Sequence, residues 1–234
     1  MEDFQFALSD TKPSNQLKPM RENEKIDLPE HRNSYRTLER LVKYLQCNIC
    51  RSINILLEGS RGTGKSFMAA SIGLTNKFDH VEISWSRAQS YPLSLIIIDD
   101  IERFVDNNSQ GVSNALKTCL KMEIPEDHKH MVIATTSDLD LLKSVKLEEE
   151  FQKTLNVPKL TSEGAEKVMG QLFSIPFEEC IKLAIDFAPV SIKDLITILE
   201  LATKVTKQDG TSTSRSVTDI DIAYTMGKLK LKVA

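Results

Sequence analysis

The sequence is poor in cysteine and in aromatic residues, and it has no long apolar run. Aromatic residues make up 6% of its 234 positions, and there are four cysteines. Only Cys47 and Cys50 lie close together, without a second pair or a histidine at ligand spacing, so we expect two buried thiols and no zinc site. The run Leu95–Ile98 is far shorter than the roughly 20 apolar residues of a membrane-spanning helix. Because the acidic start of the chain also lacks the apolar part of a secretory signal, we expect a cytoplasmic protein.

An excess of charge of one sign is also missing. The chain has 30 Lys and Arg against 33 Asp and Glu, and the ranges 1–40, 41–160 and 161–234 each carry one more acidic than basic residue. Proteins that bind nucleic acid through charge use a basic stripe or arm to neutralise the phosphates. The even distribution therefore predicts that nucleic acid is not a partner.

Hydrophobic periodicity divides the chain into three parts. Residues 1–35 are polar, contain prolines and show no sustained period, which predicts an extended linker. Residues 36–160 alternate apolar strands with amphipathic helices, which is typical of an α/β core with a parallel sheet. Residues 161–234 show helical periodicity alone, which predicts a separate helical part. The expected strands are 53–57, 81–85, 93–98, 130–135 and 153–157. The expected helices are 35–46, 65–77, 112–122, 138–146, 163–173, 176–188, 191–205 and 218–229.

A glycine-rich segment, GSRGTGKS at 59–66, fits the phosphate-binding Walker A pattern in full and lies between an expected strand and an expected helix. Its glycines let the loop curl so that N–H groups face inward, where the start of the following helix adds its positive end. Lys65 supplies a point charge to the β- and γ-phosphates of ATP, and the Ser66 hydroxyl is a ligand for Mg²⁺. The alternative is a glycine-rich turn that binds no ligand. The residues predicted to contact the nucleotide are Gly59, Ser60, Arg61, Gly62, Thr63, Gly64, Lys65, Ser66, Phe67 and Met68.

An apolar strand ending in two carboxylates, LIIIDD at 95–100, fits the Walker B pattern. We expect Asp99 to hold Mg²⁺ through water beside Ser66, and Asp100 to polarise the attacking water as the catalytic residue. Aspartate is one methylene shorter than the glutamate common at this position, so we expect slow hydrolysis. At the end of the next strand, Thr135, Thr136 and Ser137 supply hydroxyls at the sensor position beside the γ-phosphate, and Thr136 and Ser137 are the predicted sensor residues. The alternatives are a helix or turn cap for the aspartates and a polar strand end for the hydroxyl residues.

Four segments resemble the second AAA domain of the N-ethylmaleimide-sensitive fusion factor family, the vesicle-fusing ATPases. They occur in the family's order: IDDIERFVD at 98–106, ATTSDLDLL at 134–142, LNVPKL at 155–160 and SIKDLITILELA at 191–202. The resemblance implies a P-loop AAA core, 36–160, with a C-terminal helical lid, 161–234.

The same resemblance implies the role and the partners. The expected assembly is a homo-hexamer on the surface of membranes, and its expected activity is to disassemble SNARE complexes with a SNAP-type adaptor. Within the hexamer, this domain is expected mainly to bind ATP and to support assembly. It also implies that Lys193, in the first turn of its helix, reaches the nucleotide from the lid as a further sensor.

The sequence departs from the family in two places. Only 34 positions separate Lys65 from Asp99, which leaves no room for the pore loop and the helix that the family carries there. A parallel crossover needs about a dozen residues or more, so we expect the edge strand at 81–85 to turn antiparallel or to pair poorly. No arginine lies in 148–151 where working AAA domains offer a finger to a neighbour, and Arg103 is expected to form an ion pair between subunits instead. The chain is also expected to be a fragment, a truncated relative or an incomplete version of a longer protein.

Three functions stay open at this point. The first is an ATPase of the vesicle-fusing type. The second is a structural module that binds ATP between subunits and scarcely hydrolyses it. The third is a P-loop protein that loads DNA helicases or clamps, against which the even charge distribution argues.

Overall fold

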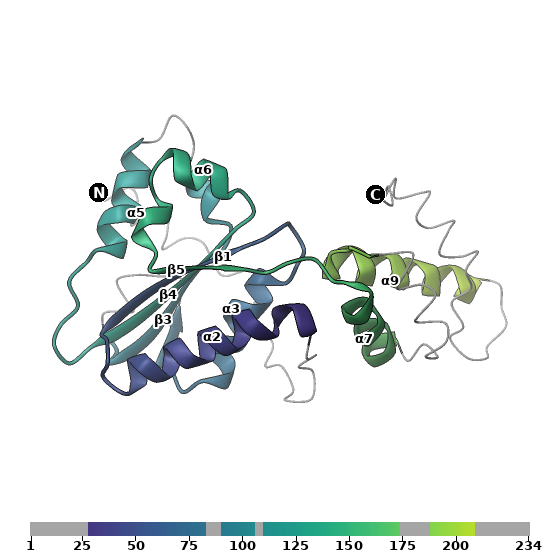
Figure 1. Ribbon diagram of the computed structural model, residues 1–234, viewed down its shortest axis with the longest axis horizontal. Coiled ribbons are helices and arrows are strands. Elements are labelled where there is room, and N and C mark those ends of the chain that lie inside the picture. Colours follow the sequence, from purple (N-terminus) through teal and green to yellow (C-terminus); the bar gives the residue numbers. More distant parts are fainter. Residues whose placement is uncertain (1–27, 83–89, 106–109, 174–187, 209–234) are drawn as a thin grey trace.

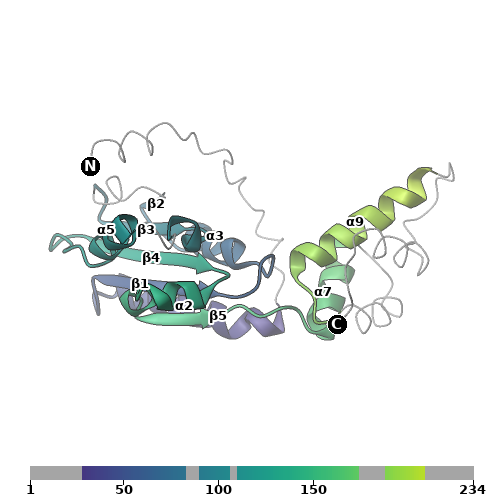
Figure 2. The same ribbon diagram turned by 90° about the horizontal axis from the view of Figure 1, so that it is seen from above.

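The computed structural model describes residues 28–82, 90–105, 110–173 and 188–208. Five parallel strands form one sheet in the order β2-β3-β4-β1-β5. The strands are β1 (Ser52–Glu58), β2 (His80–Glu82), β3 (Leu93–Ile98), β4 (Lys129–Thr136) and β5 (Lys153–Asn156). Helices lie on both faces of this sheet, as Figures 1 and 2 show. The α/β core with a parallel sheet is therefore confirmed.

The helices follow the strands in alternation and then continue alone. Helices α2 (Pro29–Gln46), α3 (Lys65–Thr75), α5 (Gln110–Leu120) and α6 (Leu139–Ser144) accompany the sheet, with the short 3-10 helices η2 (Ile101–Phe104) and η3 (Glu148–Glu150). Helices α7 (Ser162–Phe173) and α9 (Ile192–Gln208) lie beyond the carboxyl ends of the strands in both views. Among the described residues, no helix is long and apolar enough to cross a membrane. The helices expected at 176–188 and 218–229 lie outside the described residues in whole or in large part.

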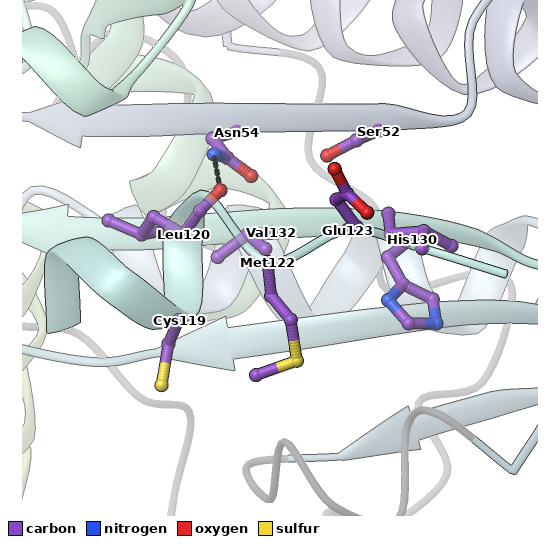
Figure 3. Close-up of a pocket in the computed structure, with 9 residues that line it drawn as sticks. Ser52, Asn54, Cys119, Leu120, Met122, Glu123, His130 and Val132 are labelled. Carbon is purple, nitrogen blue, oxygen red and sulfur yellow. Dashed lines mark hydrogen bonds between the residues drawn. The ribbon is translucent and has the colours of Figure 1, made fainter. Parts of the chain in front are cut away.

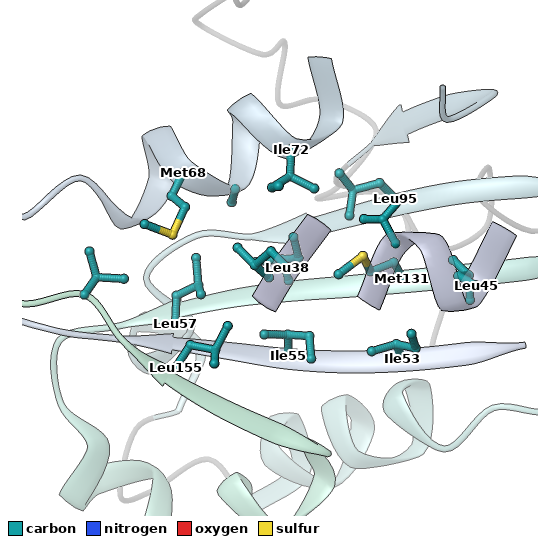
Figure 4. Close-up of a cluster of buried hydrophobic side chains, with 14 residues drawn as sticks. Leu38, Leu45, Ile53, Ile55, Leu57, Met68, Ile72, Leu95, Met131 and Leu155 are labelled. Atoms are coloured by element: carbon teal, nitrogen blue, oxygen red, sulfur yellow. The ribbon is translucent and has the colours of Figure 1, made fainter. Parts of the chain in front are cut away.

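Side chains that alternate along the inner strands form two apolar layers, one on each face of the sheet. On β1, Ile53, Ile55 and Leu57 are buried on one face, and Leu56 is buried on the other, because successive side chains of a strand point to opposite faces. Figure 4 shows the first layer, in which Met68 and Ile72 of α3 and Leu38 and Leu45 of α2 pack against the strands. The second layer joins the strands to η2, α5 and α6. A sheet buried on both faces explains why its strands read as nearly continuous apolar runs.

The first helix begins earlier than its apolar spacing predicts. The expected helix covers 35–46, whereas α2 begins at Pro29, inside the segment expected to be extended. Proline suits the first helical position because its fixed φ matches the helix and its missing N–H is not needed there. Glu30 in the first turn adds a favourable charge. The division of the chain into 1–35, 36–160 and 161–234 stays a prediction.

The edge strand corrects a second expectation. β2 pairs with β3 in parallel through three residue pairs, His80 with Ser94, Val81 with Leu95 and Glu82 with Ile96. The antiparallel alternative is therefore wrong. The described part of this strand is His80–Glu82, and residues 83–85 of the expected strand lie outside the described residues.

The cysteine pair is also more exposed than expected. α2 ends at Gln46, so Cys47 takes the C-cap position and is exposed, while Cys50 is partly exposed. Both thiols are free, and burial raises the pKa of the Cys50 thiol. The prediction of two buried thiols is wrong for Cys47, since the residue lies past the helix and not on its buried face. Within the described residues, no group of three or more His, Cys, Asp or Glu could hold a metal ion.

Candidate nucleotide-binding site

The Walker A segment forms the loop between β1 and α3, at the carboxyl end of β1. Gly64 has φ 98° and precedes the first residue of α3, Lys65, a left-handed conformation that glycine adopts without strain. Gly62 has φ 80°. The loop therefore connects the buried strand β1 to α3, and the N-terminus of α3 lies at the edge of the sheet where β1 ends. The phosphate-binding pattern requires this arrangement.

Lys65 is buried and turned back onto its own loop. Its Nζ donates to the carbonyl oxygens of Gly59, at 2.7 Å, and Ser60, at 2.9 Å. Burial lowers the pKa of Lys65, and the carboxylates of Asp100, Glu102 and Asp99 oppose this shift. Carbonyl oxygens are neutral acceptors, so an anionic phosphate would be a stronger partner for the same ammonium group.

Asp99 lies at the centre of a hydroxyl network that joins three elements. Its Oδ1 accepts from the Ser66 hydroxyl on α3, at 2.5 Å, and from the Thr135 hydroxyl on β4, at 2.7 Å. The predicted partnership of Ser66 and Asp99 is therefore present in the fold. Thr135 belongs to the same cluster, and its hydroxyl also accepts from the Asp100 N–H at 2.9 Å. Thr135 is one of the three hydroxyl residues predicted beside the γ-phosphate, but its bond to Asp99 was not predicted.

Asp100 follows in a left-handed conformation, with φ 49° and ψ 56°. Its carboxylate forms an ion pair with Arg103 at 2.6 Å, and the arginine side chain is 72% exposed. The structure thus gives Arg103 a partner within its own chain, whereas we expected one in a neighbouring subunit. A non-glycine residue in this backbone region costs free energy, which is typical of positions that neighbouring contacts hold in place.

The two predicted sensor residues of the core differ in their contacts. The buried Thr136 hydroxyl accepts from the N–H of Asp138 at 3.1 Å, which forms a turn at the end of β4. The Ser137 N–H and hydroxyl both donate to Oε1 of Glu102, at 3.0 and 2.6 Å. Burial raises the pKa of Glu102, whereas the hydrogen bonds from Ser137 lower it. The lowering is larger, so the pKa of Glu102 lies below its usual value. Sequence reasoning missed Glu102, although it lies within the segment that carries the resemblance.

The start of α9 lies directly on the Walker A loop. The Lys193 N–H donates to the carbonyl of Gly62 at 3.1 Å. A Cβ atom added to Gly62 would lie 2.8 Å from the Ser191 hydroxyl and 2.9 Å from the Lys193 Cβ. The Ser191 hydroxyl also accepts from the Asp194 N–H at 3.1 Å, which caps the helix. The fold brings Lys193 to the loop through its main chain, and its predicted side-chain role stays a prediction.

The start of α2 fastens the link between core and lid. His31 Nε2 lies 3.0 Å from the Pro158 carbonyl, and the Ser34 hydroxyl donates to the carbonyl of Asn156 at 2.8 Å. The N–H of Thr161, just before α7, donates to Glu30 Oε1 at 2.7 Å. The Thr161 hydroxyl donates to the same oxygen. These bonds give α2 a role that its apolar pattern does not reveal.

The remaining residues of the Walker A prediction have different environments. Phe67 is 52% exposed, whereas Met68 is buried in the core and its N–H donates to the Gly64 carbonyl at 2.8 Å. The Thr63 N–H and hydroxyl both donate to the carbonyl of Ser60, at 3.4 and 3.0 Å. Ser60 and Arg61 are exposed at the tip of the loop. The nucleotide contacts of all ten residues stay a prediction.

The oxygen donors at this edge fit a small, hard cation. A serine hydroxyl and a carboxylate in direct contact, Ser66 and Asp99, are the ligand types that Mg²⁺ accepts. Mg²⁺ keeps several waters and takes further oxygens from phosphates, so it needs no all-protein cage. The lack of a larger ligand cluster among the described residues is therefore compatible with this ion.

A small pocket lies at the opposite end of the strands (Figure 3). It is lined by residues at the starts of β1 and β4 and after α5, among them Ser52, Asn54, Cys119, Glu123 and His130. The buried Asn54 amide donates to the main-chain carbonyls that surround it, including that of Leu120 at 3.0 Å. This end of the sheet is far from the Walker residues along the strands and carries none of them.

Comparison with known proteins agrees with the motifs. A model of the family described as "ATPase family associated with various cellular activities (AAA)" matches residues 76–159. The vesicle-fusing ATPase of Arabidopsis thaliana is 30% identical over an alignment that covers 86% of this chain and 32% of that protein. The vesicle-fusing ATPase of Dictyostelium discoideum is 26% identical, with the same coverage of 86% and 32%. The vesicular-fusion protein SEC18 of Saccharomyces cerevisiae is 25% identical over 196 residues, 69% of this chain and 26% of that protein.

Two conclusions follow from these matches. Residues 76–159 match the AAA family, and the resemblance to vesicle-fusing ATPases that the motifs predicted is confirmed. The chain spans about a third of the length of the first two relatives.

Proposed function

We propose, from the premise of an AAA domain that resembles the vesicle-fusing ATPases, that this chain binds ATP with Mg²⁺, hydrolyses it slowly and uses the bound nucleotide to hold subunits together. The observation that carries the proposal is the joint placement of the buried Lys65 and of Asp99, with its two hydroxyl partners, at the N-terminus of α3. A structural glycine-rich turn needs neither a buried ammonium group nor a carboxylate beside it.

The chain's own residues divide the work of binding. Lys65 would exchange its loop carbonyls for phosphate oxygens, and the N-terminus of α3 would add its positive end. Ser66 and Asp99 would hold Mg²⁺, the aspartate through water. When bound, Mg²⁺ neutralises phosphate charge. The contact of the α9 start with Gly62 supports a role for the lid in closing the site.

Slow hydrolysis follows from Asp100, the residue proposed to polarise the attacking water. Its side chain is shorter than glutamate, and one of its two oxygens is occupied by Arg103 at 2.6 Å. A general base must lie within hydrogen-bond reach of the water that it activates. A short carboxylate held by an arginine meets this requirement poorly, so tight binding with slow turnover is the expected behaviour.

The assembly and its partners extend the same proposal. The relatives are named for vesicle fusion, and the resemblance implies a homo-hexamer that serves SNARE disassembly with a SNAP-type adaptor in the cytoplasm. The nucleotide site lies between core and lid, where ATP would connect the two parts and stiffen a subunit edge. Without a pore loop, substrate threading is not proposed for this domain.

The experiment that tests nucleotide binding compares two lysines of one helix region. Lys65→Ala should reduce ATP affinity by more than 100-fold in calorimetric titration, because the buried charge is lost. Lys77→Ala, at an exposed position just after α3, is the matched control and should bind normally. Equal ATP affinity in both variants would refute the proposal.

Size-exclusion chromatography with and without ATP tests the proposed hexamer. A monomer in both conditions would refute the assembly part of the proposal.

A second candidate function is a module that binds ATP and does not hydrolyse it. The occupied carboxylate of Asp100 favours this candidate. Steady-state phosphate release separates the two functions. Turnover that Asp100→Asn removes would exclude the purely structural module, and no turnover despite stoichiometric bound ATP would exclude the enzyme.

A further inference from the structure

Glu102 accepts two hydrogen bonds from Ser137. Its Oε1 accepts from the Ser137 hydroxyl at 2.6 Å and from the Ser137 N–H at 3.0 Å. The carboxylate comes from η2, just after β3, and the serine follows β4. The bonds therefore join the ends of two neighbouring parallel strands at the edge where the nucleotide site lies.

The charge of Glu102 belongs to the same electrostatic environment as the phosphate-binding lysine. Glu102 and Asp100 both oppose the loss of the proton from Lys65, so the Glu102 carboxylate lies close enough to interact with that ammonium group. The second oxygen of Glu102, Oε2, is buried and meets no donor at hydrogen-bond geometry among the described residues. The Ser137 hydroxyl and N–H each lower the pKa of Glu102 more than the Thr136 hydroxyl does, so Ser137 supplies the main hydrogen bonds to this carboxylate.

A serine hydroxyl has one proton and can donate it to one acceptor at a time. While the Ser137 hydroxyl donates to Glu102, it does not donate to a phosphate oxygen. A nucleotide with a γ-phosphate therefore competes with Glu102 for this proton, whereas a nucleoside diphosphate does not. The Ser137 N–H can stay on Oε1 throughout and keep the two strand ends together.

We propose that Glu102 is a positioning residue that sets the preference of the site for ATP over ADP, by holding the Ser137 hydroxyl until a γ-phosphate takes it. This inference rests on the proposed function of ATP binding. It assigns to Glu102 a role that neither Walker motif gives it. Because the competing bond is charge-assisted and about twice as strong as a neutral one, the free energy of breaking it reduces the gain from the γ-phosphate.

The test is a double-mutant cycle on the ratio of the ATP and ADP dissociation constants, measured by calorimetry on the full chain. Glu102→Gln keeps an acceptor oxygen for Ser137 but removes the charge, and the preference for ATP should rise about fivefold since the competing bond is weaker. In a Ser137→Ala background the same change should have a clearly smaller effect, because only the long-range charge effect is left. Glu126→Gln, an exposed change before the start of β4 at the other end of that strand, is the matched control.

The outcomes separate the inference from the proposed function. If the ratio changes equally with and without the Ser137 hydroxyl, or does not change, the inference is overturned while ATP binding stands. If neither nucleotide binds the wild-type chain, the proposed function fails and the inference fails with it. Glu102→Ala adds a structural check. If Glu102 only stabilised the loop, the alanine variant would lower the melting temperature and leave the ATP to ADP ratio unchanged, which would also overturn the inference.

Discussion

The two ends of the parallel sheet hold their buried polar groups in different ways. At the carboxyl ends, the Ser66 and Thr135 hydroxyls donate to Asp99, and Lys65 donates to loop carbonyls. A hydroxyl rotates and an ammonium group has three equivalent protons, so each of these donors can exchange its partner without a change in the backbone. This end is therefore suited to accept a ligand.

At the amino ends, the polar groups are held between fixed partners. The Asn54 amide nitrogen donates to the carbonyls of Leu120, at 3.0 Å, and Glu150, at 3.2 Å. Both acceptors belong to the main chain and lie at the ends of other elements, so the amide connects α5 and η3 to β1. The comparison teaches that buried polar side chains serve binding where a donor can turn to a new acceptor, and serve folding where one amide joins main-chain carbonyls of two different elements.

The largest expected effect is on ATP affinity, from a substitution at the carboxyl ends of the strands. Asp99→Asn should weaken the affinity for ATP in the presence of Mg²⁺ by about 10- to 100-fold, as the loss of groups that support a metal does. The free energy of unfolding should change little, because an amide oxygen can still accept from Ser66 and Thr135. Titration with and without Mg²⁺ measures the effect. Asp140→Asn, at an exposed position of α6, is the control, and equal losses in both variants would contradict the assignment.

The converse change is expected at the other end of the sheet. Asn54→Leu keeps the side-chain size but leaves two buried carbonyls without their donor, so the free energy of unfolding should fall by about 2–3 kcal/mol. Urea denaturation measures this loss, and the nucleotide affinity of the folded protein should stay the same. Asn114→Leu, on the exposed side of α5, should be nearly neutral. A variant with normal stability and lost nucleotide binding would show that the two ends are not independent.

A smaller effect tests the contact between lid and loop. Gly62→Ala places a side chain at φ 80° and into the first turn of α9, and the left-handed backbone alone costs about 1–2 kcal/mol. We expect nucleotide affinity to fall about tenfold, because the lid start must move away from the loop. Gly170→Ala, where an added Cβ meets no atom within 4 Å, is the control. Unchanged affinity in Gly62→Ala would mean that the lid contact does not contribute to the site.

The smallest effect concerns the start of α2. Burial raises the pKa of Glu30, whereas the hydrogen bonds from Thr161 lower it. The lowering is larger, so the pKa of Glu30 lies below its usual value in the folded chain. A carboxyl group of this kind stabilises the fold above its unfolded pKa, and this contribution is lost as the pH falls through the folded pKa. Glu30→Gln should therefore lower stability at neutral pH by less than about 1 kcal/mol, given the partial exposure of the pair.

The pH dependence gives the sharper measurement for Glu30. Between about pH 5 and the folded pKa, the variant should lose less stability than the wild type on acidification. Glu149→Gln, at an exposed position of η3, should follow the wild-type curve. Identical curves for all three proteins would show that the bonds to Thr161 do not contribute to the stability of the fold.

Strong local patterns made much of this molecule predictable. The strand at 93–98 has the predicted bounds, because apolar side chains at five of its six positions, all but Ser94, require burial on both faces. The two Walker patterns place Asp99 beside Ser66, and the two side chains are in contact in the fold. The start of α2 and the direction of the edge strand were not predicted. A helix start with few apolar residues gives little periodic signal, and strand direction depends on the length of the crossover.

The hydrogen bonds of Glu102 and Thr135 show what a single sequence does not reveal about the site. Thr135 belongs to the hydroxyl segment predicted beside the γ-phosphate, but its bond to Asp99 was not predicted, and Glu102 reads as one charge in a polar turn. Their roles depend on hydroxyl and carboxylate groups that approach from other elements, at 2.7 Å to Asp99 and 2.6 Å to Ser137. Such distances follow from strand order and register, which residue type alone does not specify.

By itself, the sequence determined the local chemistry of this protein: which strands are buried on both faces, and where a glycine-rich loop can cradle phosphate. These properties depend on residue type and spacing within short segments, so they can be read directly. Only the tertiary structure decided which groups share a hydrogen bond, as when Glu102 takes both donors of Ser137, Arg103 pairs with Asp100, and the start of α9 lies on Gly62. The physical reason is that a hydrogen bond or an ion pair forms over about 3–4 Å, whereas these partners are brought together by the packing of whole elements.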